Sequence, residues 1–177
     1  KHKAGPFFLY LPFNAQHAPL QAPQKYLDRF PNLEGNRKIF AAMMSAKDDA
    51  VGRVLAKVKE IGAEENTLVW YLADNGGPTA STTSMNGPLR GFKATTWEGG
   101  VRVPFLVRWP AKIASGKVSN GIQEHLDVFT TLAAAAGVPD VAKQLRASHN
   151  VHIDGVNNLA HWTSDGPSER SIVYYYN

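Results

Sequence analysis

The chain has 177 residues, of which 44% are hydrophobic and 19% charged, with no cysteine and a net charge of +4. This composition is typical of an ordered globular protein that is long enough to bury one core, and it excludes a disordered chain. The small positive charge, without a run of basic residues, argues against nucleic acid as a partner. No apolar run is long enough to cross a bilayer.

Strands and helices are predicted to alternate along the chain. An apolar strand at residues 6–13 precedes a loop at 18–23, whose prolines exclude regular structure. Apolar residues at helical spacing predict a helix over 37–61. This helix is expected to end at Gly62, because glycine is favoured just beyond a helix C-terminus.

The rest of the chain continues this alternation. The expected elements are a strand at 67–73, a polar loop at 77–94, a strand at 101–109, a helix at 125–136 stopped by Gly137 and Pro139, and a strand at 171–177. Such an order predicts an α/β fold with a mainly parallel sheet and helices on both faces. We find no linker, so residues 1–177 are expected to form part of a single domain. Both ends read as internal cuts, which predicts a domain truncated at each end.

The strand at 67–73 ends in Asp74, Asn75, Gly76 and Gly77. A buried parallel strand delivers such side chains to the carboxyl edge of its sheet, and the two glycines let the chain turn sharply away. Carboxylate and amide oxygens suit Ca²⁺ or Mg²⁺ better than zinc. The alternative interpretation is an ordinary Asn-Gly turn after a strand.

Further motifs accompany this strand end in a fixed order. They are Phe-Phe-Leu-Tyr-Leu at 7–11 followed by His-Ala-Pro at 17–19, Ala-Asp-Asn-Gly-Gly at 73–77, Gly-Phe-Lys at 91–93 and Trp-Glu-Gly-Gly-Val-Arg-Val-Pro at 97–104. Together they resemble the type I, formylglycine-dependent sulfatases of the alkaline-phosphatase-like superfamily, from about Pro6 to about Trp162. The resemblance implies an alkaline-phosphatase-like α/β fold and the hydrolysis of a sulfate ester. The implied partners are a sulfated small molecule or glycan and the remainder of the chain's own catalytic domain.

The resemblance also implies roles for four residues. His17 and Lys93 match the catalytic residues that bind the substrate sulfate and stabilise negative charge on its oxygens. Asp74 and Asn75 match ligands of a divalent cation, Ca²⁺ in preference to Mg²⁺. Taken without the resemblance, His17 is equally well explained as a residue that caps the proline-rich loop, and Lys93 as a surface lysine.

The nucleophile of such an enzyme is not found in this sequence. The family forms formylglycine from the first residue of a Cys/Ser-x-Pro-x-Arg motif, and no stretch fits that pattern. The nearest stretch, residues 164–170, has the wrong spacing and follows the other motifs, whereas the family places its nucleophile before them. The formylglycine and the further metal-binding aspartates are therefore expected outside this chain. The resemblance implies a periplasmic, secreted or lysosomal-type compartment, which the sequence itself leaves open.

Two other functions are compatible with these motifs. Phosphodiesterases and phosphonate hydrolases of the same superfamily share metal ligands at this kind of strand end, but they often use two metals. The single Asp-Asn pair in this chain favours a one-metal sulfatase. A non-catalytic, sulfatase-like binding module is the alternative from a different class of protein, and the missing nucleophile motif supports it.

The remaining polar and aromatic residues are interpreted as structural. Asp48 and Asp49 are expected on the solvated flank of the helix at 37–61. Glu98 and Arg102 are read as a structural pair, and Asp127 as the start or cap of the next helix. No motif supports a function for the other candidates, which are His125, the histidines 149, 152 and 161 (assigned to loops) and the tyrosines 174–176 (assigned to strand packing).

Overall fold

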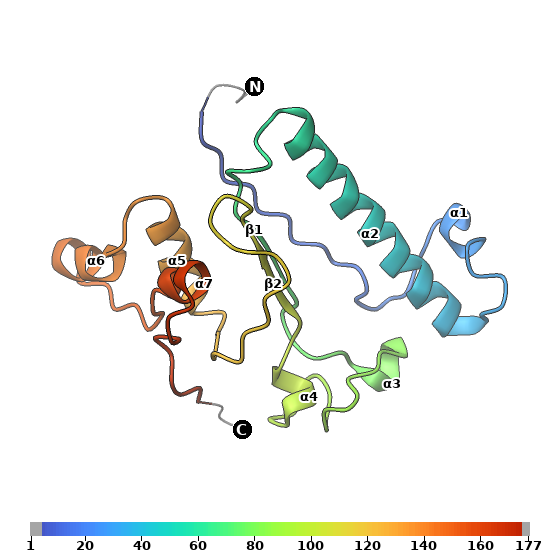
Figure 1. The fold of residues 1–177 in the computed structure, drawn as a ribbon. Helices are drawn as coiled ribbons and strands as arrows, with labels where there is room; N and C mark the ends of the chain where they lie inside the picture. Colours follow the sequence, from blue (N-terminus) through green and yellow to red (C-terminus); the bar gives the residue numbers. More distant parts are fainter. Residues whose placement is uncertain (1–4, 175–177) are drawn as a thin grey trace. The chain divides into compact units, whose positions relative to one another are not determined.

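The computed structural model describes residues 5–174, and residues 1–4 and 175–177 lie outside the described part. The elements, in chain order, are α1 (Gln24–Leu27), α2 (Gly35–Glu60), β1 (Val69–Leu72), α3 (Thr79–Thr82), α4 (Glu98–Val101), β2 (Phe105–Arg108), α5 (Asp127–Ala135), α6 (Val141–His149) and α7 (Leu159–Ser164) (Figure 1). The described residues fall into two compact units, 5–106 and 107–174, and the division lies within β2.

The helix α2 is the longest element of the first unit, and it packs against α1 and α3 (Figure 1). It begins two residues before the predicted start and ends at Glu60. Gly62 follows with a φ of +71° and donates its N–H to the Lys59 carbonyl, while the Ala63 N–H bonds the Val58 carbonyl. These two bonds form a Schellman motif, which satisfies the last carbonyls of the helix. The predicted C-terminal role of Gly62 is therefore confirmed.

The strands β1 and β2 pair in a two-stranded sheet. Just beyond the strands, the Ala73 N–H donates to the Pro104 carbonyl and the Gly76 N–H donates to the Gly100 carbonyl. The later residue of the first segment thus pairs with the earlier residue of the second, so the two segments run in opposite directions. This pair is therefore antiparallel, and the loop that joins the two strands contains α3 and α4. The α/β class is as predicted, but the parallel pairing is not found between these two strands.

Residues 6–13 form no strand in the described structure, although the sequence predicted one. They are extended and apolar, but a strand needs a neighbouring backbone edge, and no described segment provides one. Their apolar side chains, among them Phe7, Leu9 and Leu11, are exposed, and Phe8 is 78% exposed. Phe7 and Leu9 line a groove of 660 Å³ whose other wall is α2.

The other predicted strands are shorter than expected or absent. The segment predicted as a strand at 101–109 contributes only residues 105–108, because residues 98–101 form the helical turn α4. Residues 171–174 are in no strand, and Tyr175 and Tyr176 lie outside the described residues. The polar loop at 77–94 contains the single turn α3.

In the second unit, α5 begins at Asp127 and ends before Gly137, close to the predicted bounds. Gly137, with a φ of +95°, donates to the Ala134 carbonyl and Val138 to the Ala133 carbonyl, a second Schellman motif. The helices α6 and α7 pack against α5 and were not predicted. They place His149 and His161 on helices, which corrects their assignment to loops, whereas His152 lies in a connecting segment as expected.

Asp127 is the centre of the second unit. Its carboxylate is fully buried and accepts N–H groups from Glu124 at 3.0 Å and Val156 at 2.9 Å. Arg170 donates to the same carboxylate through Nε at 2.8 Å and Nη2 at 2.7 Å, and this contact raises the pKa of Arg170. A further ion pair of 3.0 Å joins Arg170 to Glu124. The predicted structural role of Asp127 is confirmed, and it extends well beyond helix capping.

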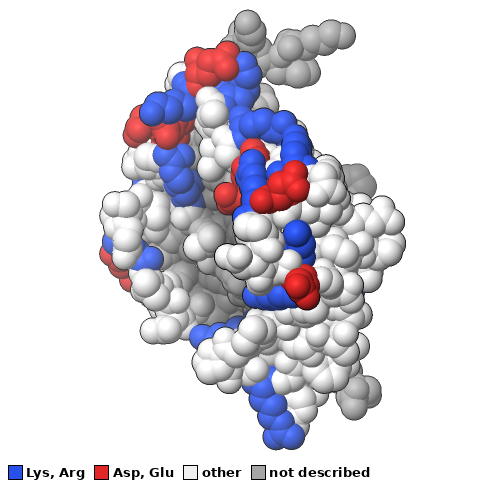
Figure 2. All heavy atoms as spheres, turned by 90° about the vertical axis from the view of Figure 1, so that its right-hand side faces the viewer, with Lys and Arg blue, Asp and Glu red and all other residues white. Residues whose placement is uncertain are grey.

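Charges on the face of α1 and α2 are mixed in sign (Figure 2). Arg29 pairs with Asp49 at 2.8 Å, and this hydrogen bond lowers the pKa of Asp49. Asp48 is exposed on the same helix, which agrees with the predicted solvated flank. Glu98 and Arg102 form the expected ion pair at 3.7 Å, with both side chains exposed.

None of the helices described between residues 5 and 174 combines the length and apolar character needed to cross a bilayer.

We predict that Asp127→Ala lowers the free energy of unfolding by about 3–5 kcal/mol, because it leaves a largely buried arginine and two backbone N–H groups without their acceptor. Asp49→Ala breaks the exposed pair with Arg29 and is the matched control, for which we expect a much smaller loss. Urea unfolding of the full-length protein measures both. Equal losses of unfolding free energy in the two variants would show that the buried Asp127–Arg170 pair is no more important for stability than the exposed Asp49–Arg29 pair.

Candidate active site

The turn after β1 is held by glycines that touch other backbone segments. A Cβ on Gly76 would overlap the carbonyl oxygen of Gly99, and one on Gly100 would overlap the Thr95 carbonyl. The Gly76 N–H in turn donates to the Gly100 carbonyl at 2.9 Å. Only glycine permits this approach, so the paired glycines at 76–77 and 99–100 serve to bring two chain segments into direct backbone contact.

Asn86 ties the loop at 77–94 to the same turn. Its Oδ1 accepts the Gly77 N–H at 2.9 Å, and its Nδ2 donates to the Gly77 carbonyl at 2.8 Å and to the Gly91 carbonyl at 3.2 Å. This role of Asn86 was not predicted from the sequence. The Asn-Gly-Pro sequence at 86–88 signals a turn, but the partners of its side chain are nine and five residues away and carry no sequence signal.

His17 and Lys93 are in contact, although they are 76 residues apart in sequence. The Lys93 ammonium lies 3.2 Å from His17 Nε2, and His17 Nδ1 lies 2.7 Å from the carbonyl of Ala18. A carbonyl can only accept, so Nδ1 carries the proton and Nε2 accepts from the lysine. Lys93 also approaches the turn through its backbone, whose N–H lies 3.5 Å from the Gly77 carbonyl.

The loop that carries His17 is fixed from two sides. The His17 N–H bonds the Asn14 carbonyl at 2.8 Å. Lys47, half-buried on α2, donates to the side chain of Gln16 at 3.1 Å and lies 5.5 Å from the centre of the Tyr71 ring on β1. The neighbour of His17 is thereby connected to both the helix and the strand.

Asp74 and Asn75 follow the end of β1 after one intervening residue, Ala73, close to the predicted strand end. Asp74 is exposed, and within residues 5–174 we find no hydrogen bond or ion pair to its carboxylate. Asn75 uses its amide nitrogen to bond the Gly76 carbonyl at 2.9 Å, which leaves Oδ1 available as a ligand. Within the described residues, no group of three or more acidic or histidine side chains is placed to hold a metal ion. The assignment of Asp74 and Asn75 as ligands of a cation stays a prediction.

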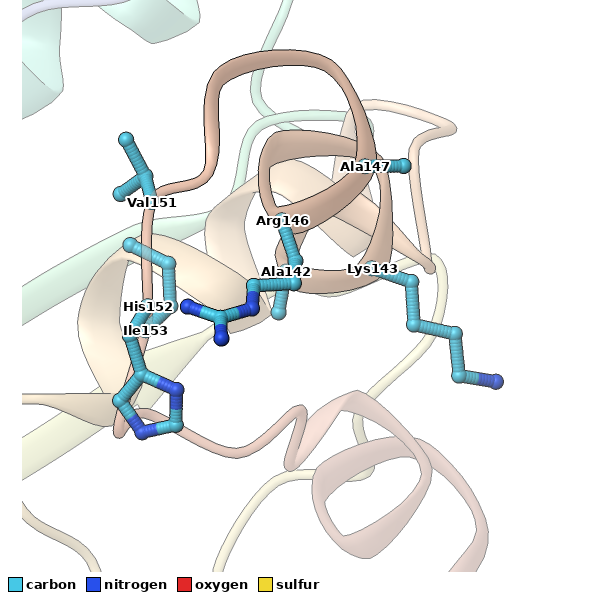
Figure 3. Close-up of a pocket in the computed structure, with 7 residues that line it drawn as sticks. All are labelled: Ala142, Lys143, Arg146, Ala147, Val151, His152 and Ile153. Carbon is cyan, nitrogen blue, oxygen red and sulfur yellow. The ribbon is translucent and has the colours of Figure 1, made fainter.

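A separate pocket of 390 Å³ lies in the second unit, between α6 and residues 151–153 (Figure 3). Figure 3 shows the Arg146 side chain turned toward His152 and the Lys143 side chain directed away. His152 pairs with Asp154 at 3.0 Å and Lys143 with Asp140 at 3.6 Å. None of the four residues predicted from the sequence lines this pocket, so it is not the candidate active site.

Solved structures establish the class of fold to which this geometry belongs. The structure described as Ps i-CgsB in complex with k-i-k-neocarrahexaose superimposes with a TM-score of 0.82 at 37% identity. The match covers 94% of this chain and 35% of that chain. A phosphonate monoester hydrolase from Silicibacter pomeroyi shares the fold at a TM-score of 0.56 and 24% identity. These neighbours agree with the predicted alkaline-phosphatase-like fold.

The sulfatase family profile matches residues 1–138, and the chain belongs to the sulfatase family. It is 33% identical over 176 residues to N-acetylgalactosamine-6-sulfatase from Mus musculus, and 36% identical over 173 residues to arylsulfatase A from Homo sapiens. The matches cover 98% and 97% of this chain. The chain spans about a third of the length of these relatives, 32% and 31% respectively.

We predict that Asn86→Ala lowers both stability and turnover, because it removes three hydrogen bonds that hold the loop of Lys93 to the turn after β1. Loss of these bonds should cost about 2–3 kcal/mol in unfolding free energy, and misplacement of Lys93 should reduce kcat about tenfold or more. Thermal unfolding and steady-state kinetics of the full-length protein measure the two effects. Asn36→Ala, an exposed change on α2, is the control and should alter neither.

Proposed function

We propose that the intact protein hydrolyses a sulfate ester, and that His17, Lys93, Asp74 and Asn75 belong to its active site. The observation that carries this proposal is the contact between Lys93 and His17, beside the turn that bears Asp74 and Asn75. Segments that are distant in sequence meet there, and glycine contacts join the turn after β1 to the loop at 90–100. Membership of the sulfatase family supports the same conclusion.

Lys93 and His17 would act on the sulfate group. The ammonium of Lys93 is a compact charge that neutralises the oxygens of the sulfate and the charge that grows on the leaving oxygen. His17 Nε2 faces Lys93 and would donate to a sulfate oxygen in the form that carries a hydrogen on Nε2. Both groups meet a charge that is larger in the transition state than in the ground state, so they favour turnover over ground-state binding.

Asp74 and Asn75 would hold a divalent cation, Ca²⁺ in preference to Mg²⁺. The exposed carboxylate and the available amide oxygen are hard donors, and Ca²⁺ accepts such oxygens in irregular geometry. Because the amide of Asn75 is neutral, it adds an oxygen ligand without adding negative charge that would repel sulfate. When bound, the cation polarises a sulfate oxygen. The other ligands and a formylglycine nucleophile would come from the part of the protein outside these 177 residues.

The substrate is proposed to be a sulfated glycan. Relatives at 33% identity are named N-acetylgalactosamine-6-sulfatase, and the related Ps i-CgsB structure contains k-i-k-neocarrahexaose, an oligosaccharide by its name. Relatives above 30% identity that bear sulfatase names favour sulfate ester hydrolysis over phosphonate hydrolysis. The alternative, a non-catalytic binding module, predicts that the full-length protein does not hydrolyse an aryl sulfate.

We predict that Lys93→Ala in the full-length protein reduces kcat for an aryl sulfate by about a hundred- to a thousand-fold, because one charge-stabilising donor is lost from the transition state. Lys59→Ala removes an exposed lysine of α2 and should leave kcat unchanged. Release of the chromogenic phenol measures both. Near wild-type turnover in Lys93→Ala would make the lysine a surface residue, and a wild-type protein without turnover would favour the non-catalytic module.

A second test concerns the metal. We predict that Asp74→Ala abolishes calcium-dependent activity of the full-length protein while its thermal unfolding changes little, since the exposed carboxylate has no partner among the described residues. Isothermal titration with CaCl₂ measures the affinity directly. Asp48→Ala is the matched control and should bind calcium like the wild type. Unchanged calcium affinity in Asp74→Ala would remove this residue from the metal shell.

A further inference from the structure

An arginine and a tryptophan form an exposed stack on the loop that carries Lys93. The guanidinium carbon of Arg90 lies 3.7 Å from the centre of the Trp97 ring, and Trp97 is 51% exposed. Within residues 5–174 we find no hydrogen bond or ion pair to the Arg90 side chain. A cation is thus held on an aromatic face with its N–H groups still available as donors.

The backbone around this stack is built to hold it. Gly91 has a φ of +93°, and a Cβ at this position would lie 2.5 Å from the Trp97 Cβ and 2.7 Å from Thr95 Oγ1. Only glycine therefore lets Trp97 close over the turn. The Gly99 N–H donates to the Arg90 carbonyl at 2.6 Å, which fixes the start of the turn against its end.

The same loop carries the residue proposed to bind the scissile sulfate. Lys93 follows Arg90 by three residues and lies in a turn at 92–95, which Thr95 Oγ1 closes by accepting the Phe92 N–H at 3.2 Å and donating to the Phe92 carbonyl at 2.7 Å. The two cations therefore lie close together in sequence on the same loop. Stacking restrains the Arg90 guanidinium in advance, so less conformational entropy is lost when it binds an anion.

We propose that Arg90 and Trp97 form a second substrate subsite, which binds an acidic group of the sugar other than the sulfate that is cleaved. This inference rests on the proposed function. The planar guanidinium offers two parallel N–H donors that match a sulfate or a carboxylate, and the exposed part of the indole offers apolar contact to the sugar ring. The substrate class is accordingly a glycan that carries at least two acidic groups.

The test compares two substrates of the full-length protein, a disulfated sugar and an aryl sulfate with a single sulfate. The measured quantity is the ratio of kcat/KM for the disulfated substrate to that for the aryl sulfate. Arg90→Gln should lower this ratio about tenfold, mainly through KM, because one charge-assisted contact is lost. Arg53→Gln, an exposed change on α2, should leave the ratio at the wild-type value. An unchanged ratio in Arg90→Gln overturns the proposal.

Two further variants, Arg90→Lys and Trp97→Leu, test the same subsite. If Arg90→Gln does not fold, Arg90→Lys replaces it, since lysine keeps the charge but lacks the two parallel N–H donors of the guanidinium. The ratio of kcat/KM values should then fall several-fold in Arg90→Lys. An unchanged ratio in this variant overturns the proposal. Trp97→Leu should lower the ratio too, because it removes the surface that restrains the guanidinium. A purely structural stack would instead lower kcat/KM equally for both substrates.

A binding measurement separates this inference from the proposed function. Isothermal titration with the disulfated sugar requires no turnover, and Arg90→Gln should bind it about tenfold more weakly than the wild type. Equal affinities overturn the subsite even if the enzyme is active. A wild-type protein that releases no sulfate from either substrate overturns the proposed function, and the titration then still decides whether Arg90 binds an acidic sugar.

Discussion

The close approach of two backbone segments, the turn at 74–77 and the loop at 90–100, is the constraint on which the first unit depends. The amide of Gly76 reaches the Gly100 carbonyl only because neither residue has a side chain. This contact sets where β1 ends and where the chain returns toward β2. It also determines the position of the polar residues on both segments, since each lies within three residues of a glycine in contact. The motif glycines are thus explained by geometry rather than by flexibility.

Asp127 in the second unit and Asp74 in the first unit differ in the surroundings of their carboxylates. Asp127 is buried, and its carboxylate oxygens accept backbone N–H groups and an arginine, so these contacts stabilise the folded state. Asp74 is exposed and has no partner among the described residues, and Arg90 likewise has no anionic partner there. Charged groups left without internal partners on rigid backbone are suited to bind a ligand, because binding requires little rearrangement of the protein.

The sequence was sufficient where the determining signals are local. The helix α2 was predicted from apolar residues at helical spacing, and the ends of α2 and α5 were predicted from Gly62 and Gly137, which both adopt a positive φ in the structure. The contact of His17 with Lys93 agrees with the motif order, although their roles and those of Asp74 and Asn75 are still predictions. Asp127 was recognised as a helix start, but its partner Arg170 lies 43 residues away and has no local signature.

The predictions of secondary structure were wrong where a strand or helix depends on contacts with residues far away in the sequence. The apolar run at 6–13 has the composition of a strand, but a ladder requires a neighbour that the described residues do not supply. The pairing of β1 with β2 joins residues more than 30 positions apart, so the two strand sequences carry no signal for its antiparallel direction. The helix α6 has only nine residues and none of them is buried, and it was not predicted from the sequence.

The placement of Asp127 has a consequence for the order in which the chain folds. Its acceptor sites are filled by Val156 and Arg170, which follow it by 29 and 43 residues. During synthesis from the N-terminus, α5 is therefore complete well before its carboxylate can be neutralised. The second unit should remain loosely packed on the ribosome until residue 170 has emerged, whereas the contacts of the first unit are available once residue 106 has been made.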